Sequence, residues 1–216
     1  MAMETRRPYI PWPHLKRSLV AILRGVRPPE VEPIVAALIE AGFEAIEIPL
    51  NSPDPFTSIE TAAKLAPPGC LIGAGTVLDV DEVDRLAGAG GRLMVSPNVA
   101  AEVIARASAH GMLTMPGVFT ATEALLAVSA GASALKFFPA SVLGAAGINA
   151  IRAVLPGDME IGAVGGVSEA DFAAYAAAGI RTFGLGSSLY RPGASAAEIG
   201  SKARSIVTAY DTVFGE

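Results

Sequence analysis

Short apolar runs alternate with longer amphipathic segments along most of the chain. The runs are SLVAILRG (18–25), AIEIPLN (45–51), CLIGAGTV (70–77), LMVSPN (93–98), MLTMPGV (112–118), ALKFFPA (134–140), EIGAVGGV (160–167) and TFGLGSS (182–188). Between them lie segments of helical character such as 28–42, 79–91, 100–111, 120–132 and 168–179, and a last one, 195–213, closes the chain. Several end in Ala-Gly or His-Gly, which is typical of a helix C-terminus. The pattern predicts eight successive strand–helix units.

The near-continuous apolar character of the runs predicts a parallel sheet whose outer face is covered by helices. Each unit takes about 25 residues, the size of a compact βα repeat. We therefore expect an α/β fold, a single-domain (β/α)8 TIM barrel over residues 18–216 with a short N-terminal extension, 1–17, whose Trp12 packs on the barrel. A doubly wound open sheet is the alternative, but it usually carries GxGxxG after its first strand, and SLVAILRGV has none.

Composition and charge narrow the possible partners. Hydrophobic residues make up 51% of the chain and charged residues 17%, with a net charge of −5 and no Lys/Arg cluster, which argues against disorder and against nucleic acid. No run approaches the roughly 18 apolar residues of a membrane span, and no signal peptide is evident. A single cysteine, Cys70, fits a reducing compartment, so we expect a cytoplasmic protein without a membrane partner. His14 and His110 show no metal-ligand spacing, and we expect no metal or cofactor.

A lysine inside an apolar strand is the first candidate for chemistry. Of the four lysines, only Lys136 falls within a predicted strand, in ALKFFPA. Alternation turns Lys136 and Phe138 to one side and Leu135 and Phe137 to the other, so Lys136 can point into the barrel. Desolvation there favours the neutral amine, which is a nucleophile toward carbonyl carbon.

Glu47 is the expected counterpart of Lys136. It lies in AIEIPL on the second strand, which is opposite the sixth strand in a ring of eight, and it faces the interior by the same alternation. A carboxylate beside the amine can move the protons that imine formation requires. The alternative is a buried Lys–Glu pair with a purely structural role.

Two glycine-containing turns predict an anion site. Gly165-Gly166 follows the seventh strand, and Gly186-Ser187 follows the eighth. In TIM barrels the loops after strands 7 and 8 are the usual phosphate site, although glycines also serve ordinary tight turns. Arg24 ends the first strand, where its guanidinium suits a carboxylate or phosphate, with a surface salt bridge as the alternative.

With these residues in place, the chain resembles the 2-keto-3-deoxy-6-phosphogluconate / 6-phosphogalactonate (KDPG/KDPGal) aldolase family. The resemblance covers about residues 18–192 and is carried by AILRG (21–25), EIPLNSP (47–53), LIGAGTVL (71–78), SPN (96–98), MPGVFTATEA (115–124), ALKFFPA (134–140), AVGGV (163–167) and GLGSSLYRPG (184–193).

The resemblance implies a class I aldolase: a metal-free (β/α)8 barrel, commonly a homotrimer, that forms a Schiff base with a phosphorylated keto-acid substrate. Lys136 would form the imine, and Glu47 would be the general acid/base. Arg24 and Thr76 would lie near the keto-acid end of the substrate, and the phosphate would be held by Gly165, Gly166, Gly186 and Ser187.

Two positions match the galactonate branch of that family. Asn51 stands where the gluconate branch commonly has arginine, and Val164 stands where it commonly has threonine. The implied reaction is cleavage of 2-dehydro-3-deoxy-6-phosphogalactonate to pyruvate and D-glyceraldehyde 3-phosphate. Three alternatives stay open: the gluconate epimer as substrate, a non-covalent sugar-phosphate isomerase or epimerase, and a catalytically silent phosphometabolite-binding barrel.

Overall fold

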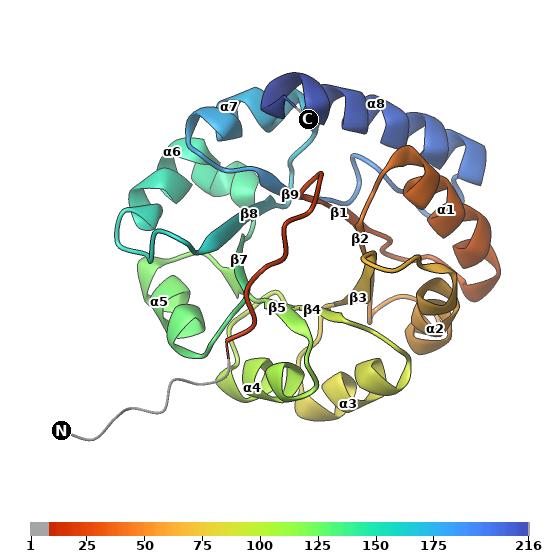
Figure 1. Ribbon diagram of the computed structural model, residues 1–216, viewed down its shortest axis with the longest axis horizontal. Coiled ribbons are helices and arrows are strands. Elements are labelled where there is room, and N and C mark those ends of the chain that lie inside the picture. The colour runs from red at the N-terminus through yellow and green to blue at the C-terminus, as the bar shows by residue number, and fades with distance from the viewer. Residues whose placement is uncertain (1–8, 216) are drawn as a thin grey trace.

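The computed structural model describes residues 9–215, which form a ring of parallel strands inside a ring of helices (Figure 1). The strands are β1 (Leu19–Ile22), β2 (Ala45–Pro49), β3 (Leu71–Gly75), β4 (Leu93–Val95), β5 (Leu113–Met115), β6 (Gly117–Val118), β7 (Ala134–Phe137), β8 (Glu160–Val164) and β9 (Thr182–Leu185). The helices are α1 (Pro28–Ala41), α2 (Pro55–Leu65), α3 (Val80–Gly88), α4 (Ala101–Ala109), α5 (Ala121–Ser129), α6 (Ala140–Arg152), η1 (a 3₁₀ turn, Glu169–Asp171), α7 (Phe172–Ala177) and α8 (Ala196–Phe214).

The sheet closes through its fifth strand position, which two short strands share. The order is β5-β4-β3-β2-β1-β9-β8-β7-β6, with β5 paired to β4 and β6 paired to β7. Only Pro116 separates β5 from β6, and the Lys136 N–H donates to its carbonyl at 2.9 Å. The predicted (β/α)8 barrel is therefore confirmed and the open sheet excluded. The run 112–118 forms two short strands, because Pro116 has no N–H for the ladder.

Alternation along each strand sorts the apolar side chains into two cores. Outward-facing residues such as Ile46 and Leu135 pack under the helices and form the larger core. Inward-facing residues form a smaller one inside the ring. No helix within residues 9–215 is both long enough and apolar enough to cross a bilayer.

The amino-terminal end of the barrel is closed by residues 9–17, which cross the ring of strands (Figure 1). Leu15 is buried, and Ile10 and Trp12 pack beside it on inward residues near the strand starts. We call this cluster the barrel floor; it comprises Ile10, Trp12, Leu15, Val20, Ala45, Leu71, Leu93, Leu113 and Ala134. Trp12 thus packs on the barrel as predicted; residues 1–8 of the predicted extension lie outside the described residues.

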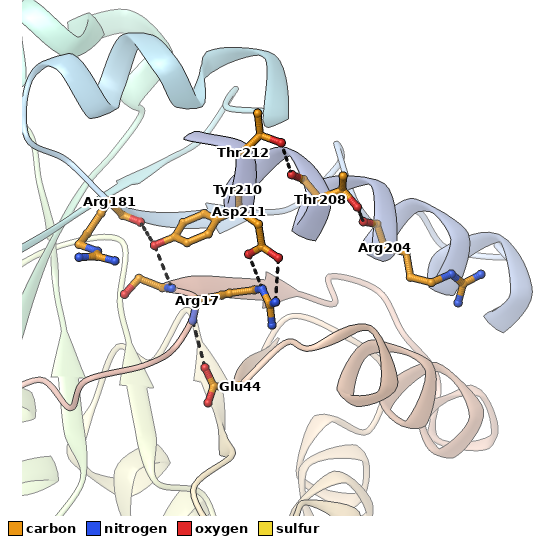
Figure 2. A network of polar contacts seen from close by, with 9 residues as sticks. Arg17, Glu44, Arg181, Arg204, Thr208, Tyr210, Asp211 and Thr212 are labelled. Atoms are coloured by element: carbon orange, nitrogen blue, oxygen red, sulfur yellow. Dashed lines mark hydrogen bonds and ion pairs between the residues drawn. The ribbon is translucent and has the colours of Figure 1, made fainter. Parts of the chain in front are cut away.

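Polar contacts fasten the end of this segment to the barrel wall (Figure 2). The Arg17 guanidinium donates from Nε and Nη2 to the two carboxylate oxygens of Asp211 in α8, at 2.6 and 2.8 Å. The Arg17 N–H donates to Glu44 at 3.1 Å, and the Ser18 N–H donates to the Tyr210 hydroxyl at 3.3 Å. The chain thus enters β1 held between the start of β2 and the last helix.

Candidate active site

Lys136 lies in β7 and points into the barrel. Its side chain is 5% exposed. The neighbouring side chains of Leu135 and Phe137 point the other way and belong to the larger core under the helices. Its partners on the adjacent strands are Gly117 and Gly162, which carry no side chains. A Cβ atom at either glycine would overlap Met115 or the Pro97 backbone, so the amine is buried in a closely packed interior.

Phe138 follows on the same side and covers the amine. The Lys136 Nζ lies 4.8 Å from the centroid of its ring. Gly165 makes space for this ring, since a Cβ atom there would lie 2.9 Å from it. An aromatic face at this distance attracts a cation and excludes water.

Glu47 occupies the corresponding position in β2 and is 1% exposed. Its strand neighbours are Ile22 and Gly73. One carboxylate oxygen, Oε2, has no hydrogen-bond partner among residues 9–215. A buried carboxylate oxygen without a partner is costly to keep, so its presence points to a ligand or reaction that uses it.

Burial moves both groups toward neutrality. Desolvation raises the pKa of Glu47 from 4.5 to about 7, against the opposing fields of Lys136 and Arg24 and a hydrogen bond from the Gly75 backbone. Desolvation likewise lowers the pKa of Lys136, while Glu47 acts in the opposite direction. Each group influences the pKa of the other, so the structure brings the two predicted residues into one site. A carboxyl group with a pKa near neutrality suits proton transfer, and an amine with a lowered pKa suits nucleophilic attack.

Arg24 and Thr76 lie at the carboxyl ends of β1 and β3. Arg24 is exposed, and its Nη1 donates to Asn51 Oδ1 at 2.6 Å, which joins the ends of β1 and β2. Its charge acts on both Glu47 and Lys136. Thr76 is half-buried with a φ of 57°, a left-handed conformation that is uncommon for threonine and often found near functional sites.

The two predicted anion loops meet at the same end of the barrel. Gly165 and Gly166 have φ angles of 90° and 71°, which favour glycine, and Gly166 is exposed. The Ser188 hydroxyl donates to the Val167 carbonyl at 3.0 Å and so ties the loop after β9 to the loop after β8. Ser187 is exposed next to this contact.

Two further predicted positions fit this end of the barrel. Val164 is buried in the inner core at the end of β8, beside Gly184 on β9. Gly186 begins the turn after β9, where its carbonyl accepts from the N–H groups of Leu189 and Tyr190, both at 2.8 Å.

Two surface pockets lie away from the Lys136–Glu47 pair. A pocket of about 560 Å³ adjoins the anion loops and is lined by Ser168, Glu169, Ala170, Ser187, Ser188, Leu189, Arg191, Ala194, Glu198, Ile199 and Lys202. Another of about 460 Å³ opens near Cys70 at the amino-terminal end. The amine and carboxylate are distinguished from the groups in these pockets because they are buried and each influences the pKa of the other. Within residues 9–215, no group of three or more His, Cys, Asp or Glu side chains is placed to hold a metal ion.

Sequence reasoning overlooked Gly75. It lies on the strand next to Glu47, and its backbone forms a hydrogen bond with the Glu47 carboxylate. One signal was available: Gly73 and Gly75 are two residues apart and share the inward face of a strand beside the predicted acid.

A small parallel barrel whose interior holds a buried amine beside a buried carboxylate defines a class of enzyme able to form imines with carbonyl compounds. The sequence profile of the KDPG and KHG aldolase family matches residues 14–199. The chain belongs to the KDPG and KHG aldolase family.

Two relatives and one solved structure illustrate that membership. A probable 2-dehydro-3-deoxy-6-phosphogalactonate aldolase of Rhizobium meliloti (strain 1021) is 68% identical over 95% of this chain and 97% of that protein. The 2-dehydro-3-deoxy-6-phosphogalactonate aldolase of Escherichia coli (strain K12) is 49% identical over 90% of this chain and 95% of that protein. A solved structure described as native KDPGal superposes with a TM-score of 0.92 at 46% identity, covering 96% of this chain and all of that one.

Proposed function

We propose that this chain is a class I aldolase that cleaves 2-dehydro-3-deoxy-6-phosphogalactonate to pyruvate and D-glyceraldehyde 3-phosphate. The observation that carries the proposal is the buried Lys136 amine beside the buried Glu47 carboxyl group, each with its pKa moved toward neutrality by desolvation. The relatives named above support the choice of substrate.

The first half of the reaction builds the imine. The neutral Lys136 amine attacks the C2 ketone to give a carbinolamine, and Glu47 donates a proton to the departing hydroxyl, which leaves as water. The product is a protonated imine, whose positive charge draws electrons from the C3–C4 bond. Glu47, now ionised, is ready to act as a base.

The second half breaks the carbon–carbon bond. Glu47 accepts the proton of the C4 hydroxyl, the C3–C4 electron pair moves into the imine to form an enamine, and the aldehyde leaves. Protonation of the enamine carbon by Glu47 gives the protonated pyruvate imine. Water hydrolyses it to pyruvate and the free amine, and the released proton returns to Glu47. One carboxyl group thus serves as acid and base in turn, which a pKa near 7 permits.

Substrate binding is assigned to the carboxyl ends of the strands. Arg24 and Thr76 take the keto-acid end, and the amides around Gly165, Gly166, Gly186 and Ser187 take the phosphate. Remote binding of the phosphate helps to orient the reacting bond. Val164 is apolar and is assigned to the C4 region, where it tilts selectivity toward the galacto-configured acid. The side-by-side cleavage rates of the galacto- and gluco-configured acids test this assignment.

Borohydride trapping tests the covalent mechanism. Incubation with pyruvate and borohydride is expected to add one reduced pyruvate adduct to a peptide that contains Lys136, as measured by mass spectrometry. A Lys136→Met variant is expected to fold, form no adduct and lose turnover. A wild-type protein that gains no adduct while remaining active on a sugar phosphate would point instead to isomerase or epimerase chemistry without a covalent intermediate.

We also infer that the chain assembles as a homotrimer and works in the cytoplasm. Exposed apolar side chains near the carboxyl ends of the strands, including Phe119, Phe138 and Val142, support a contact surface there. The single free cysteine, Cys70, is compatible with a reducing compartment. Sedimentation at three times the 22.0 kDa chain mass is the expected result, and sedimentation as a monomer would contradict it.

A further inference from the structure

Gly75 and Glu47 lie face to face on neighbouring strands. Glu47 pairs with Gly73 across β2 and β3, so Gly75 is the next inward position toward the carboxyl end. A Cβ atom at Gly75 would lie 2.5 Å from the Glu47 carboxyl carbon and closer still to both carboxylate oxygens. The carboxylate therefore occupies the volume that any side chain at position 75 would need.

The backbone does not itself require glycine at position 75. Gly75 is absent from the residues with positive φ, so alanine could adopt its conformation. Gly73 is different: a Cβ atom there would overlap the backbone of Leu93, which makes that glycine necessary for strand packing. The atoms excluded at Gly75 belong to Glu47, and this links the glycine to the carboxylate.

Gly75 also contributes a polar contact. Its backbone interaction is among those that favour the ionised form of Glu47 and limit the rise in pKa that burial causes. The Oε2 atom of the carboxylate is buried and has no hydrogen-bond partner among the described residues, and it is the atom nearest to the Cβ position at Gly75. Gly75 thus gives the carboxylate the volume that it occupies, and one oxygen of that carboxylate keeps its hydrogen-bonding capacity unused.

We propose that Gly75 is a positioning residue that holds the Glu47 carboxylate at the distance from Lys136 that proton transfer requires. The inference rests on the proposed aldolase function for its catalytic meaning, whereas the contact itself depends only on the fold. A methyl group at position 75 must push the carboxylate away from its present place. A displacement of about 1 Å in a catalytic group can lower the rate on the order of a hundredfold.

The kinetic test compares wild type with Gly75→Ala. The exchange of pyruvate methyl protons with deuterated solvent, followed by NMR, reports proton transfer without the phosphorylated aldehyde. We expect the saturated exchange rate to fall on the order of a hundredfold, with the pyruvate concentration at half-saturation changed by less than about threefold. Prolonged borohydride trapping should still label Lys136, since the amine remains in place.

A double variant separates positioning from general damage. Adding Gly75→Ala to Glu47→Ala should change the residual exchange rate by less than about twofold, because the displaced carboxylate is already gone. Gly75→Ala alone should lower the thermal midpoint by about 3–10 °C, because the added methyl group overpacks the site. In the Glu47→Ala background the same substitution should lower the midpoint far less, because the carboxylate that it would clash with is absent. Gly88→Ala, at an exposed glycine in α3 with open space around it, is the matched control and should retain activity.

The outcomes distinguish the two proposals. Near-wild-type exchange by Gly75→Ala, or an equal loss of rate in both backgrounds, would overturn the positioning role. A wild-type protein that cannot be trapped with pyruvate would overturn the aldolase proposal. The contact between positions 47 and 75 would still be tested, by comparing the fall in thermal midpoint that Gly75→Ala causes in the wild-type and Glu47→Ala backgrounds. If Gly75→Ala fails to fold, recovery of folding in the double variant supports the contact, and failure of both refutes it.

Discussion

At the residue scale, the protonation of Glu47 couples chemistry to stability. Burial raises its pKa from 4.5 to about 7, so between these values the folded chain keeps a proton that the unfolded chain has released. The unfolded state then binds fewer protons, and stability falls as the pH rises through this window. At about 1.4 kcal/mol per pKa unit, the loss amounts to about 3 kcal/mol.

A Glu47→Gln variant is neutral at every pH and avoids this loss. We expect its free energy of unfolding, relative to wild type, to increase by about 3 kcal/mol between pH 4.5 and 7.5 and to level off above that range. Urea unfolding at half-unit pH steps measures the difference. Glu102→Gln, at an exposed position on α4, is the matched control, and a pH-independent difference for Glu47→Gln would contradict the raised pKa.

At the scale of elements, the ends of β1 and β2 are joined by the Arg24–Asn51 hydrogen bond of 2.6 Å. Asn51 holds the guanidinium at the rim of the site, where we assign it to the keto-acid end of the substrate. Asn51→Ala is expected to raise the pyruvate KM about fivefold and change kcat by less than about twofold, since an exposed hydrogen bond to a charge contributes roughly 1 kcal/mol. Asn149→Ala on α6 is the control. A large fall in kcat with an unchanged KM would assign Arg24 a different role.

The Arg17–Asp211 pair ties the N-terminal segment to α8 and gives a second prediction at this scale (Figure 2). Its hydrogen bonds lower the pKa of Asp211, so its stabilisation is present above the usual carboxyl pKa of 3.8 and is lost as the pH falls through the depressed value. We expect a double-mutant cycle of Arg17→Met and Asp211→Asn to give a coupling of about 1–2 kcal/mol at pH 7 that shrinks below pH 4. A coupling that does not depend on pH would indicate packing instead of charge.

The elements also show what the sequence can and cannot predict. The strands and helices follow from alternation and from glycine stops such as Gly42 and Gly111, both in left-handed conformations. The inward positions of Lys136 and Glu47 follow from the same alternation. The fit of Gly75 against Glu47 depends on which residues face each other across strands, and that register arises only when the barrel closes.

At the scale of the whole molecule, the barrel has a closed end and a reactive end. The barrel floor fills the amino-terminal end with apolar side chains, and it includes Ala45 and Ala134, each two residues before Glu47 and Lys136. We expect the N-terminal segment to share with the strands in the desolvation that moves both pKa values. If this is so, opening the floor should change the titration of a site built on other elements.

Leu15→Ala tests that dependence. Leu15 is 5% exposed in the barrel floor, and its truncation leaves a cavity below the pair that lets water reach it. Weaker desolvation lets the pKa of Lys136 rise and that of Glu47 fall, so the neutral amine becomes scarcer. We expect the limb of the kcat/KM profile that reports the amine to move to higher pH by the rise in the amine pKa, with kcat/KM on that limb lower by about tenfold for each unit of the rise. Leu15→Met keeps the volume and should keep the profile, and Val154→Ala, at a side chain 58% exposed, controls for loss of apolar surface. Rates are measured well below the thermal midpoint, because the cavity also destabilises the fold by about 2–5 kcal/mol.

A destabilised Leu15→Ala enzyme with an unchanged pH profile would contradict this dependence. It would mean that the barrel floor supports folding alone and that the strands desolvate the amine without it.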